Sequence, residues 1–190
     1  MTYSNGDTYD GDFSHGVRDG WGMHSLISSG EVYSGYQSQG KRCKLGRVQY
    51  QDGHTYDGGW LNDEMHGQGL ETWPDGEEYS GTYQYGSKHG KGVYKYSSGH
   101  IYDGEFLSDT KHGIGTCKWP NGDIYHGEYK YGARHGKGTY ISAAGWMYEG
   151  DWRQDVEHGY GKQSYIRSGR IISDGKWNKG KFCCARRNKR

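Results

Sequence analysis

A tyrosine flanked by two glycines recurs at a nearly constant interval along this chain. One glycine lies three residues before the tyrosine and another lies two residues after it, and this pattern occurs seven times. The spacing is 24 residues once and 23 thereafter, at Tyr9, Tyr33, Tyr56, Tyr79, Tyr102, Tyr125 and Tyr148. A fixed interval of this length indicates an array of small, similar units that are stabilised by stacking on their neighbours.

One repeat, at residues 75–96, shows how the pattern translates into structure. Tyr79, Gly81 and Tyr83 occupy alternate positions, so on an extended strand they share one face. A short polar turn containing a glycine follows, and then a second alternating run at residues 92–96. Two short strands joined by a glycine-bearing turn are typical of a β-hairpin. Each repeat therefore predicts one hairpin with rings on one face.

The composition favours an open array of such hairpins over a closed globule. Aromatic residues make up 15% of the chain and all hydrophobic residues only 31%, so aliphatic side chains are scarce. The apolar content is too low for a closed core, and the ring content is too high for a disordered chain. The 35 glycines follow the repeat and only two prolines accompany them, which excludes collagen and low-complexity disorder. Most rings are expected to pack on adjacent repeats and the remainder to face solvent.

The repeats share a signature in two parts. In the third repeat, residues 56–60 read Tyr-Asp-Gly-Gly-Trp and residues 66–69 read His-Gly-Gln-Gly, and related sequences recur in the four repeats that follow. This signature resembles the MORN repeat (membrane occupation and recognition nexus). The resemblance implies an all-β fold, an elongated single-layer antiparallel sheet of stacked β-hairpins. We expect the array to occupy residues 1–182, as seven units and a partial eighth, followed by a basic tail at residues 183–190.

The second repeat departs most from the signature. Gln37 stands where the second ring belongs, Tyr36 lies one place early, and Cys43 and Lys44 replace His-Gly. Degenerate repeats are common at the ends of an array, where they cap the stack, but this one is internal. We therefore expect a local irregularity or a contact site at the second repeat.

The resemblance implies a non-enzymatic structural scaffold or adaptor that holds a helix or an extended peptide of a partner protein in an aromatic groove. It further implies a cytoplasmic location within a larger cytoskeletal complex, with the cilium or flagellum and its axoneme as the expected site. Rings beside glycines on a rigid sheet suit this role, because they can anchor an amphipathic helix or an extended peptide. The rings expected to form the partner-binding groove are Tyr56, Trp60, Tyr79, Tyr83, Tyr102, Phe106, Tyr125, Tyr129, Tyr148 and Trp152.

The C-terminal end of the chain suggests an alternative function, a peripheral membrane or phospholipid-binding module. The chain has 24 basic and 23 acidic residues, and residues 176–190 contain seven of the basic residues and none of the acidic ones. Residues 1–175 therefore hold 17 basic and 23 acidic residues, a net charge of −6. The basic residues after this point are Lys176, Lys179, Lys181, Arg186, Arg187, Lys189 and Arg190. Such a patch predicts weak contact with anionic lipid, to which acylation of Cys183 or Cys184 would add. Nucleic acid is disfavoured because the acidic body repels phosphate.

The sequence indicates no catalytic, metal or cofactor site. Equivalent histidines of successive hairpins are expected about 9–10 Å apart, twice the strand spacing, whereas a zinc ligand lies about 2 Å from its ion. These histidines are His66, His89, His112, His135 and His158. Residues 132–139 superficially resemble a phosphate-binding loop, but only three residues separate the first two glycines, and a strand is expected to follow.

The remaining features concern compartment and self-association. The four cysteines lack zinc-ligand spacing, which fits a reduced cytosolic setting. Met1 lies close to the first repeat, so no signal peptide or transmembrane segment is expected at this end. The open edges of a hairpin array make self-association plausible.

Overall fold

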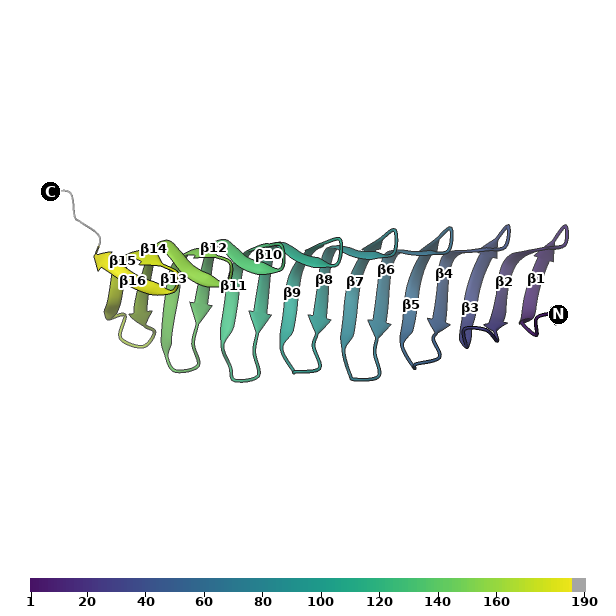
Figure 1. Cartoon of the computed structure of the whole chain (residues 1–190), viewed down its shortest axis with the longest axis horizontal. Coiled ribbons are helices and arrows are strands. Elements are labelled where there is room, and N and C mark those ends of the chain that lie inside the picture. The colour runs from purple at the N-terminus through teal and green to yellow at the C-terminus, as the bar shows by residue number, and fades with distance from the viewer. Residues whose placement is uncertain (186–190) are drawn as a thin grey trace. The chain divides into compact units, whose positions relative to one another are not determined.

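The computed structural model describes residues 1–185, and every regular element among them is a β-strand. The chain divides into two compact units, an N-terminal unit at Met1–Ser97 and a C-terminal unit at Ser98–Arg190. Within each unit, antiparallel strands follow one another in chain order, as Figure 1 shows. The predicted all-β class and single-layer arrangement of stacked antiparallel hairpins are therefore confirmed in each unit.

The N-terminal unit contains the first four hairpins. Its strands are β1 (Thr8–Ser14), β2 (Val17–Leu26), β3 (Glu31–Ser38), β4 (Lys41–Gln49), β5 (Thr55–Leu61), β6 (Glu64–Thr72), β7 (Glu78–Gln84) and β8 (Ser87–Lys95).

The C-terminal unit contains the fifth to eighth hairpins. Its strands are β9 (Ile101–Leu107), β10 (Thr110–Lys118), β11 (Ile124–Lys130), β12 (Ala133–Ile141), β13 (Trp146–Arg153), β14 (Val156–Tyr165), β15 (Ile171–Asn178) and β16 (Lys181–Ala185). The partial eighth repeat thus forms a complete hairpin, and its last strand extends three residues beyond the predicted boundary at residue 182.

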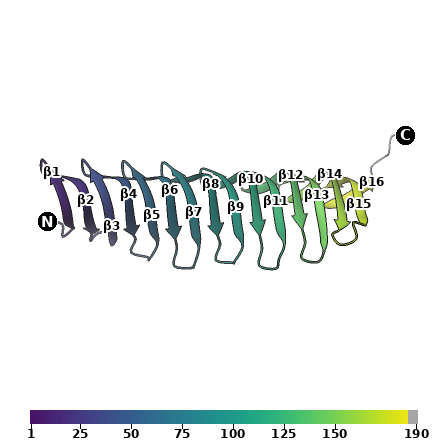
Figure 2. The ribbon, with the colours of Figure 1, turned by 180° about the vertical axis from the view of Figure 1, so that it is seen from behind.

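Two kinds of turn connect the strands, and in each unit they lie at opposite ends of the strands (Figure 2). Within a hairpin, two residues with positive φ make the turn, as at Tyr85 (48°) and Gly86 (80°). Positive φ at both central positions defines a type I′ turn, whose twist matches that of the flanking strands. Between hairpins the connection is longer, and the predicted Asp75-Gly76 turn is one example. There the Asp75 carboxylate accepts a hydrogen bond from the Glu77 N–H at 3.1 Å.

The repeated glycines make room for the repeated tyrosines. In the third hairpin Gly58 lies opposite Gly69, and the Tyr56 ring lies against both of them. A Cβ added to Gly69 would be 2.4 Å from a carbon of the Tyr56 ring, far inside van der Waals contact. The Tyr56 hydroxyl donates a hydrogen bond of 2.8 Å to the carbonyl of Gly59. The ring and the glycine pair are therefore a single packing unit.

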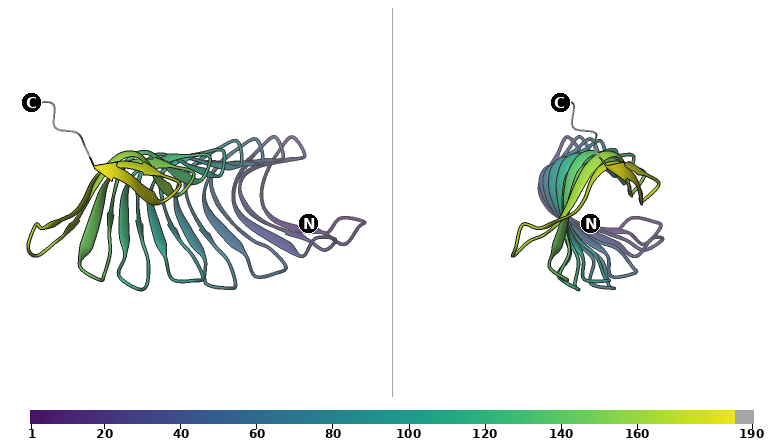
Figure 3. Two further views of the ribbon diagram at one scale, coloured as in Figure 1. Left: turned by 60° about the vertical axis from the view of Figure 1, so that its left-hand side comes forward. Right: turned by 90° about the vertical axis from the view of Figure 1, so that its left-hand side faces the viewer.

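The first seven hairpins bend beside their glycine pairs. The register shifts between Gly58 and Trp60 in the third hairpin and between Gly127 and Tyr129 in the sixth. Such bulges bend a strand and increase its twist. Figure 3 shows the resulting curvature of the strands in the N-terminal unit.

The core of each unit is a row of rings that contact one another edge to face. In the N-terminal unit the centroid of Tyr56 lies 5.1 Å from that of Tyr83 in the next hairpin, at an interplanar angle of 83°. In the C-terminal unit Tyr125 meets Trp152 of the next hairpin at 5.1 Å and 82°. Pairs of this geometry contribute about 0.5–1.5 kcal/mol each beyond their burial. The side of the sheet that carries these rings is called the ring face below, and the other side the opposite face.

Candidate functional site

The ten rings predicted to form a partner-binding groove are core residues. Between 0% and 5% of the surface of each is exposed. They are Tyr56, Trp60, Tyr79, Tyr83, Tyr102, Phe106, Tyr125, Tyr129, Tyr148 and Trp152. Alternation predicted correctly that they share a face, but not that neighbouring hairpins cover them. Rings this buried present almost no area to solvent, which corrects the expectation that they form a solvent-facing groove.

A row of cations covers the ring face, and the sequence analysis did not identify it. Each of these cations lies five residues after the second ring of the first strand, or after Gln37 in the second repeat. This constant spacing is a sequence signal that could have revealed the row. In the N-terminal unit the Arg42 guanidinium lies 4.2 Å from the centroid of the Trp60 ring. In the C-terminal unit Arg134 lies 4.4 Å from the Trp152 ring. The row consists of Arg18, Arg42, Lys88, Lys111 and Arg134. These cations cover the faces of the rings and place positive charge between the rings and solvent.

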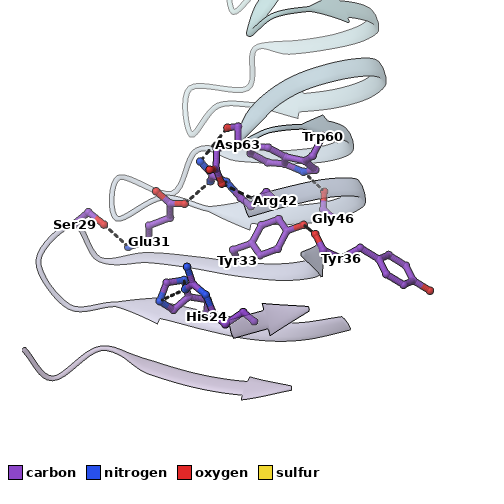
Figure 4. Close-up of polar contacts among 10 residues, drawn as sticks. His24, Ser29, Glu31, Tyr33, Tyr36, Arg42, Gly46, Trp60 and Asp63 are labelled. Carbon is purple, nitrogen blue, oxygen red and sulfur yellow. Dashed lines mark hydrogen bonds and ion pairs between the residues drawn. The ribbon is translucent and has the colours of Figure 1, made fainter. Parts of the chain in front are cut away.

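Most of these cations are balanced by carboxylates of the same unit. Arg42 pairs with Glu31 at 2.6 Å and with Asp63 at 3.4 Å, as Figure 4 shows. Arg134 pairs with Asp155 at 3.2 Å. On the ring face of each unit, the buried rings are therefore covered by ion pairs.

The most buried of these acids, Glu71 on β6, is 5% exposed and accepts three contacts. His54 Nε2 lies 2.9 Å away, Lys88 Nζ 2.8 Å and the Tyr83 hydroxyl 2.6 Å. Burial, followed by the hydrogen bond to Glu71, raises the pKa of Tyr83 far above its ordinary range. The carboxylate thus joins the third hairpin to the fourth.

The five histidines of the repeated His-Gly pairs are half-buried in their strands. Nowhere in residues 1–185 do three or more His, Cys, Asp or Glu side chains gather closely enough to hold a metal ion. The histidines are His66, His89, His112, His135 and His158.

The opposite face of the C-terminal unit carries a groove of about 640 Å³ across β10 to β15. The apolar side chains in it belong to Ile114, which is 48% exposed, and Tyr160, which is 57% exposed. Backbone of paired glycines lines it, at Gly127, Gly138, Gly150 and Gly161. Charges of both signs surround these residues, at Glu128, Lys137, Glu149, Lys162 and Asp174.

Acids that follow the first-strand glycine accept backbone N–H groups beside this groove. Asp151 accepts the backbone N–H of Tyr160 at 2.8 Å and pairs with Lys137 at 2.5 Å. Burial alone would raise the pKa of Asp151, but the contacts from Lys137 and Tyr160 lower it below its ordinary value. In the preceding hairpin Glu128 accepts the N–H of Lys137 at 2.7 Å. The carboxylates thus satisfy donors that the bulges leave outside the strand ladder.

The predicted basic tail belongs partly to the array. Lys176 lies in β15 and Lys181 in β16, with Lys179 in the turn between them, and all three are exposed. Cys183 and Cys184 are exposed residues of β16. Four other residues predicted to be part of this patch lie outside the described residues: Arg186, Arg187, Lys189 and Arg190. Residues 1–185 include no helix that is long and apolar enough to cross a membrane.

Comparisons with known proteins agree with this architecture. Over 74 residues the chain is 33% identical to Alsin of Rattus norvegicus and 32% identical to Alsin of Homo sapiens. The match covers 37% of this chain, which spans about 4% of the length of these curated relatives. A solved structure of the G-box domain of the microcephaly protein CPAP superposes with a TM-score of 0.52 at 14% identity, covering 90% of this chain and 94% of that one. At this identity the likeness concerns the fold alone.

The MORN repeat family model matches six segments of the chain. The matched residues are 9–23, 56–78, 79–101, 102–124, 125–147 and 148–169. The unmatched stretch at residues 24–55 contains the second hairpin, where Gln37 and Lys44 depart from the signature. The eight hairpins, the ring core and the six matched segments together show that the chain belongs to the MORN-repeat family.

Proposed function

We propose that this protein is a non-enzymatic scaffold or adaptor that binds segments of partner proteins. The observation that carries the proposal is the groove on the opposite face of the C-terminal unit. Its exposed Ile114 and Tyr160 supply apolar anchors for a partner segment. Charges of both signs around the groove provide polar contacts for an extended peptide or a helix.

The groove is tested with a substitution at Tyr160 and a matched substitution outside it. Tyr160→Ala is expected to weaken capture of partner proteins, whereas Tyr131→Ala, in the exposed turn of the sixth hairpin, leaves capture unchanged. Chemical crosslinks from the native assembly should start at Lys137 and Lys162 in the groove more often than at the exposed Lys118. Equal capture by both variants, with crosslinks spread evenly over the lysines, would contradict the proposal.

The proposed setting is a cytoskeletal assembly, with the cilium or flagellum as its site. Membership of the MORN-repeat family supports this placement, because the family resemblance implies a structural scaffold in a cytoskeletal complex. Imaging of the tagged full chain in ciliated cells tests it. Signal along the axoneme is expected, and a diffuse distribution in every cell type would count against it.

The exposed end of the eighth hairpin favours a second candidate function, peripheral membrane binding. Lys176, Lys179 and Lys181 are exposed there beside Cys183 and Cys184. Clustered lysines attract anionic lipid weakly and in a salt-dependent manner. Flotation with phosphatidylserine vesicles distinguishes this function, since a chain without residues 176–190 should lose any binding shown by the full chain. Absence of flotation by the full chain would eliminate the membrane function.

A further inference from the structure

The second hairpin of the N-terminal unit contains a pocket beside the position at which other hairpins carry a ring. In the third and seventh hairpins, a tryptophan ends the first strand on the ring face and an arginine of the preceding hairpin stacks on it, as Arg42 does on Trp60. In the second hairpin this place belongs to Gln37, and the arginine of the preceding hairpin is Arg18. A pocket of about 190 Å³ lies here, lined by Gln37, Arg18 and Arg42, whereas the equivalent pocket beside Tyr129 in the C-terminal unit is about 120 Å³.

Gln37 presents a hydrogen-bond donor that the protein does not use. Its side chain is 3% exposed, and within residues 1–185 its Nε2 has no hydrogen-bond partner. A buried amide N–H₂ without an acceptor is costly, and native structures rarely tolerate one without a reason. The pocket therefore needs a group that accepts hydrogen bonds.

The two arginines beside Gln37 differ in how their charges are balanced. Gln37 lies opposite Gly20 on β2, two residues along the strand from Arg18, and opposite Arg42 on β4. Arg42 is paired with Glu31 and Asp63 (Figure 4). Among the described residues Arg18 forms no ion pair. Its guanidinium donates instead to the His24 ring, 2.8 Å from Nε2, and to the Gly40 carbonyl at 3.0 Å.

The arrangement of charges in the pocket favours one kind of hydrogen-bond acceptor. Glu31 and Asp63 both pair with Arg42, so Arg18 is the cation of the pocket that has no carboxylate partner among the described residues, and it is the one available to an anionic ligand. A carboxylate brings one charge and two acceptor oxygens, which suit an arginine and a neighbouring amide. A phosphate carries up to two charges near neutral pH, and Glu31 and Asp63 would repel the second. At about 30 Å³ per water molecule, the pocket is large enough for an acidic side chain.

We propose that this pocket binds the carboxylate of an aspartate or glutamate side chain that a partner protein segment inserts between the first and second hairpins. The proposal rests on the proposed scaffold function for the source of that side chain. In the bound state the carboxylate accepts hydrogen bonds from Arg18 and from the Gln37 amide. The substitution of glutamine for a ring thus makes the irregular repeat a selective contact for acidic residues.

The test observes the full chain, labelled with ¹⁵N, while small probes are added. N-acetyl-glutamate N-methylamide is expected to shift the Gln37 side-chain amide and the Arg18 Nε–H signals in a saturable manner. The neutral probe N-acetyl-glutamine N-methylamide should need a concentration about tenfold higher or more, because charge-assisted hydrogen bonds are the stronger ones. Equal responses to the two probes, or no response to either, would overturn the proposal. A stronger response to inorganic phosphate would assign the pocket to phosphate and also overturn it.

Three variants locate the effect. Gln37→Trp supplies the ring that other hairpins carry and is expected to abolish the response. Arg18→Gln should weaken binding about tenfold or more, whereas Arg47→Gln, which removes an exposed arginine on the opposite face, should not change it. If Gln37→Trp disturbs the fold, the comparison of Arg18→Gln with Arg47→Gln still tests whether Arg18 binds the carboxylate. Unchanged binding by Arg18→Gln contradicts the proposal.

These measurements use no partner protein, so they fail or succeed independently of the groove. Loss of partner capture by Tyr160→Ala tests the C-terminal unit, and the probe titration tests the N-terminal pocket. A positive titration without partner capture would leave the pocket established and the scaffold function contradicted.

Discussion

At the residue scale, the repeat depends on which positions adopt a left-handed backbone conformation. The glycine of the His-Gly pair does so in most repeats, as at Gly67, where φ is +74°. In the second hairpin Lys44 takes its place with φ of 55°. A side chain in this region costs about 1–2 kcal/mol, because Cβ approaches the backbone. The Lys44 ammonium lies 5.3 Å from the centroid of the Tyr36 ring. This cation–π contact stabilises the folded state by about 0.5 kcal/mol.

Lys44→Gly is therefore expected to raise the free energy of unfolding by about 0.5–1.5 kcal/mol, as the net of these two effects. Its counterpart is Gly67→Ala, where an added Cβ meets no atom within 4 Å, so only the backbone strain acts. That variant should lower the free energy of unfolding by about 1 kcal/mol. Urea denaturation of both variants measures the two effects. Destabilisation by Lys44→Gly comparable to that by Gly67→Ala would show that the strain is absent.

His24 makes stability depend on pH. Burial, followed by the charge of Arg18, lowers the pKa of His24 below its ordinary value of 6.5. Well above pH 6.5 the imidazole is neutral in both the folded and the unfolded chain, so it contributes no pH dependence. As the pH falls below 6.5 the unfolded chain binds the proton first, and the folded state loses stability until the lowered pKa is reached.

As the pH is lowered from about 6.5 to the lowered pKa, the free energy of unfolding of wild type should therefore fall relative to that of His24→Gln. Well above pH 6.5 the difference between the two proteins should be constant. Urea denaturation of both proteins across this range measures the difference. A difference that stays constant, or rises as the pH is lowered, would contradict the assignment.

At the element scale, hairpins are joined by rings and by buried polar groups. Glu71 on β6 contacts Tyr83 and Lys88 of the next hairpin. Removing one partner of a buried ion pair is strongly destabilising, because the remaining charge is left without compensation. Glu71→Gln is expected to lower the free energy of unfolding by about 3 kcal/mol.

Glu78→Gln is the matched control in the same unit. Its ion pair with Lys95 is exposed, so its loss should cost at most about 1 kcal/mol. Thermal and urea denaturation compare the two variants. Equal losses would mean that Glu71 is not part of a buried network.

The hairpins and their shared ring face could be predicted from the sequence, because alternation and the glycine-bearing turns are local signals. Burial of the rings could not, since it depends on contacts such as Tyr56 with Tyr83, which belong to different hairpins. The Glu71 network was also missed, because its members lie 12 or more residues apart in the chain. The irregular second repeat was recognised from Gln37, but the unused amide donor became apparent only from the surrounding contacts.

At the scale of the whole molecule, the repeated tyrosines of the ring face are buried, whereas tyrosines of the opposite face and of the turns are exposed. In both units the repeated tyrosines are 0–2% exposed, whereas Tyr131 and Tyr160 of the C-terminal unit are 81% and 57% exposed. Burial also raises the pKa of Tyr125, which keeps its phenol neutral and less reactive. In the C-terminal unit, partner segments are proposed to contact Tyr160 in the groove and not the buried rings.

Tyrosine nitration of the native full chain, mapped by mass spectrometry with and without captured partner, tests this separation most directly. Without partner, Tyr131 and Tyr160 should be modified, while Tyr56, Tyr79, Tyr102, Tyr125 and Tyr148 stay unmodified. With partner bound, Tyr160 should become protected and Tyr131 should not. Nitration of the repeated tyrosines in the folded chain, or protection of Tyr131 in place of Tyr160, would contradict the account.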